Sequence, residues 1–257
     1  EELWGLKLFD RPPRGLALTY NGQVLAPLIR KFVDDLGIAL ETLQSEVERV
    51  PLRVDMLQSF SVKWLVPRLG RFHEEYQEID VWISTHDELV DLSGHGVDIA
   101  IRLGNGDYPG LTSTLLLKEH VFPVCSPVFL ARYENLKTPA DLVDVPLLLR
   151  LGDPAHPNWE DWFKKAGVGD VSPSEGTRFP DSNMALQAAK EGLGVALART
   201  AHVSDDLTAG NLVRLFDVDH RSSVSYYLVG PEAMSEKPRI VAFRDWLVGE
   251  AKMAQDE

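Results

Sequence analysis

The sequence is poor in cysteine, in long apolar runs and in export signals. Its 257 residues include one cysteine, Cys125, so an internal disulfide is excluded and a reducing compartment suits the chain. No run of about 18 apolar residues occurs, so we expect no membrane-spanning helix. The first residues, Glu1 to Trp4, lack the basic start and apolar stretch of a signal peptide. We therefore expect a cytoplasmic protein that makes no membrane contact.

Since residue 1 is not Met, we also expect the natural chain to begin upstream.

Motifs of catalysis and metal binding are absent as well. The sequence has no G-x-S-x-G elbow, no P-loop, no H-E-x-x-H and no cysteine–histidine set at zinc spacing. Cys125 lies in an apolar segment, which favours a buried, inert thiol over a nucleophile. We therefore expect no enzyme, no metal site and no cofactor.

The charge is mainly acidic and is unevenly distributed. The chain has 26 basic and 39 acidic residues and a net charge of −13. Residues 1–31 have five basic and three acidic residues, a net +2, which leaves −15 on the remaining 226. Because DNA attracts basic surfaces, only the N-terminal segment could contact it, and the acidic remainder should repel it.

The N-terminal 50 residues predict a hairpin followed by a long helix. Residues 1–19 contain two short apolar segments around a Pro/Gly-rich tip, and residues 20–48 form a helix with Thr19 as N-cap. The apolar residues of this helix repeat every 3.5 positions on average. This repeat predicts a coiled-coil seam with a second subunit; packing of the helix on its own domain is the alternative. Pro51 ends the helix and marks a domain boundary. The expected seam consists of Leu25, Ile29, Phe32, Leu36 and Leu43.

Beyond Pro51, strands alternate with helices, which is typical of a mostly parallel, doubly wound α/β sheet. Two similar sets of elements predict two lobes with a cleft between them. Pro67 predicts a kink in the first helix. We expect strands at 52–57, 79–85, 96–101, 121–125, 146–150, 177–179, 194–198, 212–216 and 224–229. We expect helices at 60–76, 87–93, 126–133, from 138, 159–166, 182–191 and 237–254.

Hydroxyl-bearing and charged residues follow several of these strands, where open α/β sheets bind ligands. Helix starts offer free N–H groups to anions, which points to a small polar ligand. The residues concerned are Ser59, Ser61, Ser84, Thr85, His86, Arg102, Asp181, Ser182 and Asn183. Alternatives remain: the serines at 59, 61 and 182 could be N-caps, and Arg102 could be a surface or interlobe ion-pair residue. His86 could be a solvated loop residue.

Several motifs together resemble the LysR-type transcriptional regulators. The segment 8–22, LFDRPPRGLALTYNG, is similar to the wing of that family's DNA-binding domain. The similarity is closest to the subgroup with the activators of glycine-cleavage and β-lactamase genes. Segments similar to the family's effector domain lie at 59–69, 96–102, 122–127, 185–197 and 243–247.

The resemblance implies an α/β fold of two Rossmann-like lobes, as in type 2 periplasmic binding proteins, preceded by a partial winged helix and a long linker helix. Residues 1–19 would be the remnant of a winged helix-turn-helix domain, and residues 20–50 the linker and dimerisation helix. Lobe I would comprise 51–122 with 229–257, and lobe II would comprise 123–228. The recognition helix that reads DNA matches no segment here, so we expect it upstream.

The resemblance also implies a DNA-binding regulator that senses a small anionic or zwitterionic metabolite in the interlobe cleft. Arg11 and Arg14 of the wing would contact DNA phosphates or the minor groove, and Asp91 approximately matches a further effector contact. Expected partners are promoter DNA, the effector, RNA polymerase and identical subunits in a homodimer or homotetramer. The alternatives are a transporter's solute-binding protein and a small-molecule enzyme. The effector-binding residues implied are Ser59, Phe60, Ser61, Thr85, Arg102, Asp181, Ser182 and Asn183.

Overall fold

The chain divides into two units, residues 1–50 and 51–257, in a computed structural model. The two are described separately. The structure describes residues 5–10, 15, 17–29, 51–86, 96–151, 158–173, 175–218 and 220–256.

The first unit contains a two-stranded hairpin and the start of a helix. Strands β1 (Phe9–Asp10) and β2 (Ala17–Leu18) pair antiparallel, and residues 20–29 are helical. The Thr19 hydroxyl accepts a 3.1 Å hydrogen bond from the Gly22 N–H, which confirms Thr19 as the N-cap. A Cβ on Gly22 would lie 2.2 Å from the Leu8 carbonyl oxygen, so only glycine fits against the hairpin here.

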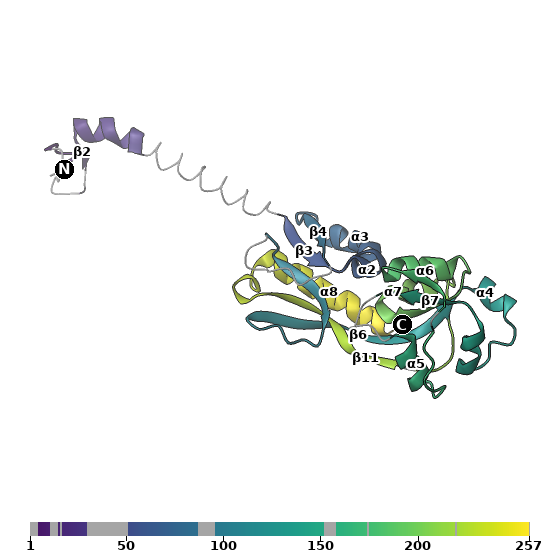
Figure 1. Ribbon diagram of the computed structural model, residues 1–257. Helices are drawn as coiled ribbons and strands as arrows, with labels where there is room; N and C mark the ends of the chain where they lie inside the picture. The colour runs from purple at the N-terminus through teal and green to yellow at the C-terminus, as the bar shows by residue number, and fades with distance from the viewer. Residues whose placement is uncertain are drawn as a thin grey trace. The chain divides into compact units, whose positions relative to one another are not determined.

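The described strands of the second unit form one nine-stranded sheet in the order β4-β3-β5-β11-β6-β9-β7-β8, with β10 paired to β6 (Figure 1). At one end β3 is parallel to β4 and β5, and at the other β7 is parallel to β8 and β9. The two longest strands, β6 and β11, are antiparallel to each other and join the two ends. The strands are β3 (Leu52–Met56), β4 (Val81–Thr85), β5 (Ile99–Gly104), β6 (Leu111–Cys125), β7 (Leu147–Arg150), β8 (Thr177–Phe179), β9 (Val195–Arg199), β10 (Val213–Arg214) and β11 (His220–Pro231).

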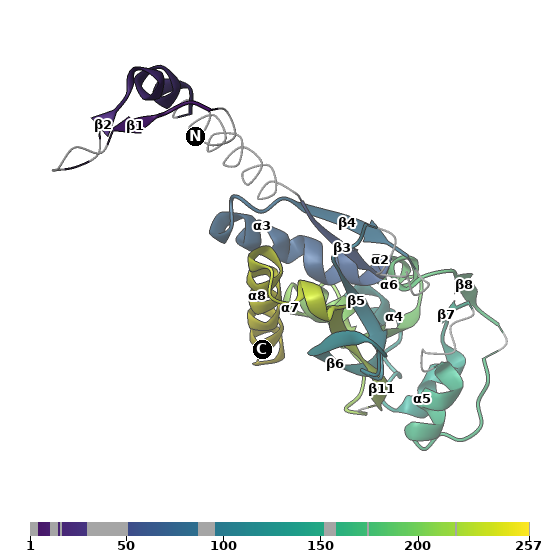
Figure 2. The same ribbon diagram turned by 90° about the vertical axis from the view of Figure 1, so that its left-hand side faces the viewer.

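Helices cover this sheet at both ends (Figure 2). Residues 58–75 form one continuous helical stretch, whose middle turn is a π-helix. The elements are α2 (Gln58–Phe60), η1 (Ser61–Leu65), α3 (Val66–Glu75), α4 (Pro127–Arg132), η2 (Pro139–Asp144), α5 (Trp159–Lys165), α6 (Ser182–Lys190), α7 (Thr200–Thr208), η3 (Glu232–Met234) and α8 (Pro238–Asp256).

Lobe I, the end that holds β3, β4 and β5, has an aromatic core between the sheet, α3 and α8. Phe72 of α3 lies edge-on to Phe243 and Trp246 of α8, with ring centroids 5.2 and 5.1 Å apart. Aromatic pairs at such distances add roughly 0.5–1.5 kcal/mol beyond the burial of their area. This core fixes α8 against the lobe, although 162 residues of sequence, 76–237, separate it from α3.

Lobe II, the end that holds β7, β8 and β9, is buried on both faces of its sheet. Leu147 and Leu149 of β7 pack into a core with Trp162 of α5, whereas Leu148 packs into a second core with Leu186 of α6. Side chains alternate between faces along a strand, so these apolar runs fill both cores. The two lobes with helices on both sides confirm the predicted fold class.

The structure corrects several expected elements. The sheet is mixed rather than mostly parallel, because β6 and β11 run through both lobes. The expected strand 121–125 is only the end of β6, and 224–229 is only part of β11. The segment from 138 is a 3₁₀-helix, η2, and the helix α7 was not predicted. The expected helix at 87–93 lies outside the described residues.

Candidate functional site

A buried carboxylate, Asp55, gathers three polar side chains at the carboxyl ends of β3, β4 and β5. Asp55 has no exposed surface. Its carboxylate accepts hydrogen bonds from the Ser84 hydroxyl at 2.7 Å and from Arg102 Nη2 at 2.5 Å, and it lies 2.5 Å from His86 Nδ1. Because β3 is parallel to both neighbours, their carboxyl ends share one edge of the sheet.

The Asp55 cluster pairs a buried carboxylate, that of Asp55, with a buried guanidinium, that of Arg102. Burial by itself would raise the pKa of Asp55, but the hydrogen bonds from Ser84, His86 and Arg102 lower it below its usual value. Arg102 is 5 % exposed, and its Nη1 has no hydrogen-bond partner among the described residues. The guanidinium therefore has one nitrogen fixed on Asp55 and a second, buried nitrogen that donates to no described residue.

A tyrosine adjoins this arginine. Tyr108 lies close enough for the charge of Arg102 to act on its pKa, although burial, the larger effect, raises that pKa. Its hydroxyl is likewise buried without a hydrogen-bond partner among the described residues. A Cβ on Gly104 would lie 2.5 Å from the Tyr108 hydroxyl, so the glycine makes room for this ring.

The predicted serines of lobe I lie within a helix and do not cap it. The N-cap of α2 is Leu57, whose carbonyl accepts from the Ser61 N–H at 3.0 Å. Ser59 is in the first turn, where backbone N–H groups have no helical partner. The N-cap alternative is therefore wrong for both Ser59 and Ser61.

The other two predicted residues of lobe I differ in exposure. Thr85, the last residue of β4, is exposed next to the Asp55 cluster. Phe60 has no exposed surface, and its ring stacks on Trp64 and lies 4.4 Å from the ring of Tyr226. Phe60 thus packs in the core beneath the helix start.

The predicted residues of lobe II lie at the start of α6. Asp181 is the N-cap, and its carboxylate accepts from the Met184 N–H at 3.0 Å. Ser182 is the first helical residue and is buried, so the N-cap alternative is wrong for it too. The Asn183 side-chain oxygen is buried without a partner among the described residues. The convergence of this group with the lobe I residues stays a prediction.

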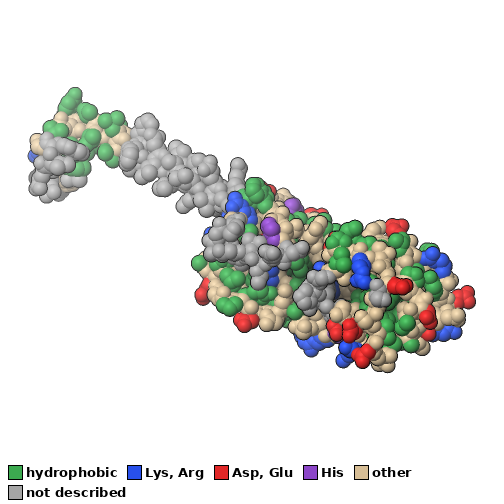
Figure 3. Space-filling model, in the orientation of Figure 1, with side chains coloured by type: hydrophobic (Ala, Val, Ile, Leu, Met, Phe, Trp, Pro, Cys, Tyr) green, Lys and Arg blue, Asp and Glu red, His purple; other side chains and the backbone are tan. Residues whose placement is uncertain are grey.

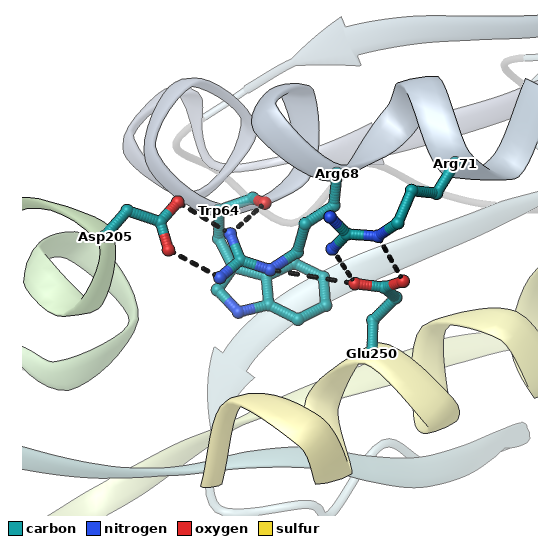
Figure 4. Close-up of polar contacts among 5 residues, drawn as sticks. All are labelled: Trp64, Arg68, Arg71, Asp205 and Glu250. Atoms are coloured by element: carbon teal, nitrogen blue, oxygen red, sulfur yellow. Dashed lines mark hydrogen bonds and ion pairs between the residues drawn. The ribbon is translucent and has the colours of Figure 1, made fainter. Parts of the chain in front are cut away.

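A second polar cluster joins the lobes around Arg68 (Figure 4). Its guanidinium makes two hydrogen bonds to Asp205 of α7, at 2.9 and 2.6 Å, and lies 3.9 Å from Glu250 of α8. It also lies over the Trp64 ring, 5.0 Å from the centroid, while Arg71 pairs with Glu250. Since α7 follows β9 of lobe II and Arg68 belongs to lobe I, these contacts link the two lobes.

Several predicted residues fall outside the part of the chain that the structure describes. These are Arg11, Arg14, Phe32, Leu36, Leu43 and Asp91. Of the expected seam, Leu25 is half-buried and Ile29 is 53 % exposed. Cys125 is fully buried, and burial raises its pKa to about 11, which confirms the expected inert thiol.

The two lobes and the polar side chains at their strand ends define the class as a two-lobed α/β ligand-binding domain. Residues 45–252 match the LysR substrate binding domain family. The chain belongs to the LysR-type transcriptional regulators. Regulators of this family bind promoter DNA and small-molecule effectors and form oligomers.

Two curated relatives and one solved structure make the assignment specific. The chain is 37 % identical over 257 residues to the glycine cleavage system transcriptional activator of Escherichia coli K12, covering all of this chain and 83 % of that protein. It is 34 % identical over 249 residues to the HTH-type transcriptional activator AmpR of Pseudomonas aeruginosa, covering 96 % and 82 %. The effector domain of that AmpR matches 80 % of this chain and 98 % of its own, with a TM-score of 0.66 and 33 % identity.

The comparisons confirm the resemblance seen in the sequence, including its subgroup. These relatives are transcriptional regulators, so the alternative of a transporter's solute-binding protein has no support. Among the described residues, no helix is both long and apolar enough to cross a membrane.

Proposed function

We propose that this regulator responds to a small anionic or zwitterionic metabolite held between its two lobes. The observation that carries the proposal is the buried Arg102, which Asp55 orients while leaving Nη1 without a partner among the described residues. A buried guanidinium nitrogen without a partner costs free energy that an anionic ligand would recover. Charge-assisted hydrogen bonds of this kind are the strong ones.

The proposed site draws on both lobes. Lobe I contributes Arg102, Thr85, Ser61 and the helix start at Ser59, where backbone N–H groups without a helical partner favour negative charge. Phe60 acts from beneath, by fixing that helix start in the core. Lobe II contributes Asp181, Ser182 and Asn183 at the start of α6, where the helix dipole adds partial positive charge.

The proposed response is a shift between lobe orientations. A ligand shifts such an equilibrium only as far as its affinities for the two orientations differ. The Arg68–Asp205 contact between α3 and α7 belongs to one orientation, so it is an element that the effector would bias. The movement would pass to the DNA-binding domain through the linker helix.

The remaining parts of the proposal concern assembly. The first unit comprises the wing, 1–19, and the linker helix, 20–50; lobe I comprises 51–122 with 229–257, and lobe II comprises 123–228. The linker helix pairs with its copy in a homodimer, and effector domains associate into a tetramer. Arg11 and Arg14 contact promoter DNA, and RNA polymerase is a further partner in the cytoplasm. Such a protein needs no catalytic chemistry of its own.

The test is a substitution at the helix start. A thermal-shift screen of a metabolite library first identifies a ligand. Ser59→Phe should then lower the affinity for this ligand at least about tenfold by calorimetry. The phenylalanine ring is larger than the serine side chain and would fill the space next to the free N–H groups. The matched control is Ser113→Phe, because Ser113 is exposed on β6 and lies far from the carboxyl end of β5. Ser113 pairs with Val229 of β11, and Val229 lies opposite Ala100, the second residue of β5. Unchanged affinity in Ser59→Phe would remove the interlobe assignment.

A further inference from the structure

Lobe II contains a cavity whose lining is rich in arginine. It has a volume of about 230 Å³ and lies at the carboxyl ends of β7, β8 and β9. Three arginines, Arg150, Arg178 and Arg199, line it, one from each strand. Among the described residues that line it, Glu160 is the acidic one.

The sheet explains why the three arginines meet. β7 lies between β8 and β9 and is parallel to both, so residues near the strand ends share one edge. Arg150 and Arg199 are the last residues of their strands, and Arg178 lies opposite Leu149 in the neighbouring strand. α6 begins at the same place, and its first residue, Ser182, also lines the cavity.

Two buried titratable groups, His202 and Glu119, lie near these arginines. His202 is buried, and burial, together with the charges of Arg199, Arg150 and Lys63, lowers its pKa to about 3. Glu119 lies close to Arg199, but burial outweighs the arginine and raises the pKa of Glu119 to about 8. Arg199 itself is 1 % exposed, and its Nη1 donates a hydrogen bond to the Ser222 hydroxyl at 3.1 Å.

The rest of the lining combines apolar side chains, such as Trp159 and Leu197, with polar ones, such as Asn158 and Ser172. The Trp159 indole donates to the Leu148 carbonyl at 3.2 Å, which fixes the ring at the cavity wall. Typical ligand pockets have about 300–1,000 Å³, so a cavity of about 230 Å³ suits a small metabolite. Its occupant should be a small molecule with a strongly anionic end.

We infer that this arginine cavity binds the doubly negative end of the effector, a phosphate monoester or a pair of carboxylates, through Arg150, Arg178 and Arg199. The inference rests on the proposed function and deepens it, because Ser182 belongs to both sites. Planar guanidinium groups bind carboxylate and phosphate oxygens in pairs, and their combined charge selects dianions over monoanions. Arg102 in lobe I would then contact another part of the same molecule.

The experiment compares four probes on the whole chain: succinate, glycerol phosphate, butyrate and butane-1,4-diamine. Thermal shift and calorimetry at low ionic strength should show binding of succinate or glycerol phosphate, and which of them binds better separates the two dianion classes. Butyrate and the diamine should bind at least about tenfold more weakly. Equal binding of all four, or no binding of either dianion, would overturn the inference.

Substitutions then locate the binding. Arg178→Gln and Arg150→Gln, both at exposed positions, should each weaken dianion binding about tenfold or more, whereas Arg150→Lys should recover part of the loss. Arg221→Gln is the control, since Arg221 is exposed on β11 and is not among the residues that line the cavity. Dianion binding at parental strength in both glutamine variants would overturn the inference.

One comparison separates this inference from the proposed function. If dianions bind to Ser59→Phe as to the parent but not to the arginine variants, the arginine cavity is right and the lobe I site is wrong. If Ser59→Phe loses binding while Arg150→Gln and Arg178→Gln keep it, the interlobe site stands and the arginine cavity does not.

Discussion

At the scale of the residue, the informative positions are charged side chains with little or no exposed surface. Asp55, Arg102 and Glu119 are each 5 % exposed or less. Ionised groups are rarely buried unless they are paired, because removing them from water is costly. Asp55 and Arg102 meet this cost by pairing with each other, whereas Glu119 meets it by a change of pKa. The first pair belongs to the proposed binding site, and Glu119 gives a measurable dependence of stability on pH.

Glu119 should make the protein less stable as the pH rises from about 6.5 to 8. In the folded state its pKa is about 8, against 4.5 for an ordinary glutamate, so over this range the folded protein holds a proton that the unfolded chain has lost. Stability then falls with pH, by roughly 1.4 kcal/mol per unit and roughly 2 kcal/mol in all. Chemical denaturation of the parent at the two pH values measures this loss, and Glu119→Gln should abolish it.

Above pH 6.5 His202 has only a small effect on this measurement. The folded pKa of His202 is about 3, against 6.5 for an ordinary histidine, so its effect has the opposite sign, and only about 0.4 kcal/mol of it remains above pH 6.5. Glu74→Gln, at an exposed position on α3, is the control and should retain the parental pH dependence. A parent whose unfolding free energy stays constant from pH 6.5 to 8 would contradict the prediction.

The sequence indicated Arg102, Ser84 and His86 as residues at strand ends, but it did not indicate Asp55, on which they meet. The sequence nevertheless contained a signal for Asp55. A strand flanked on both sides by parallel strands is buried on both faces and should be almost wholly apolar, so an aspartate within LRVDM requires a partner. The arginine cavity could not be found in this way, because it depends on which strands are neighbours.

At the scale of the element, local chemistry predicted short segments better than long ones. β8 has the bounds that the sequence predicted, since a proline and a glycine flank it. The first part of β6 was missed, because LTST lacks the apolar character of its end, and its pairing with β11 stabilises it. Pro67 predicted a kink, and the structure has a π-helical turn directly before it, at Ser61–Leu65.

The helices α3 and α7 should be energetically coupled through Arg68 and Asp205. Arg68 is largely buried, and the pair is bidentate, although Asp205 is 46 % exposed. A double-mutant cycle with Arg68→Ala and Asp205→Ala should give a coupling of about 1–2 kcal/mol. Urea denaturation of the parent, the two single variants and the double variant measures it.

The control cycle uses the exposed pair Lys164 and Glu160 of α5, which are 3.1 Å apart. Exposed pairs at this spacing on a helix contribute about 0.5 kcal/mol or less. A coupling for Arg68–Asp205 no larger than that of the control would show that these charges do not hold α7 against α3. The proposal that the effector acts on this contact to shift the lobe orientation would then be wrong.

At the scale of the whole molecule, charge and apolar surface are unevenly distributed along the chain. Residues 1–31 carry a net +2 and the rest carries −15. Over the visible face of the second unit, acidic and basic side chains are interspersed with scattered hydrophobic ones (Figure 3). The described helical residues of the first unit, by contrast, leave Val24, Leu28 and Ile29 more than half exposed. An amphipathic helix with so much exposed apolar surface calls for a partner.

The linker helix should therefore set the oligomeric state. Leu25→Glu combined with Ile29→Glu places two carboxylates on the expected seam, where pairing with a second helix would bury them next to like charges. Sedimentation velocity should then show a smaller assembly than that of the parent. Asn21→Asp combined with Gln23→Glu adds the same charge at exposed positions off the seam and should leave the mass unchanged. If the seam variant sediments as the parent does, this helix packs within its own unit, and the contacts that join the subunits belong to the effector domains.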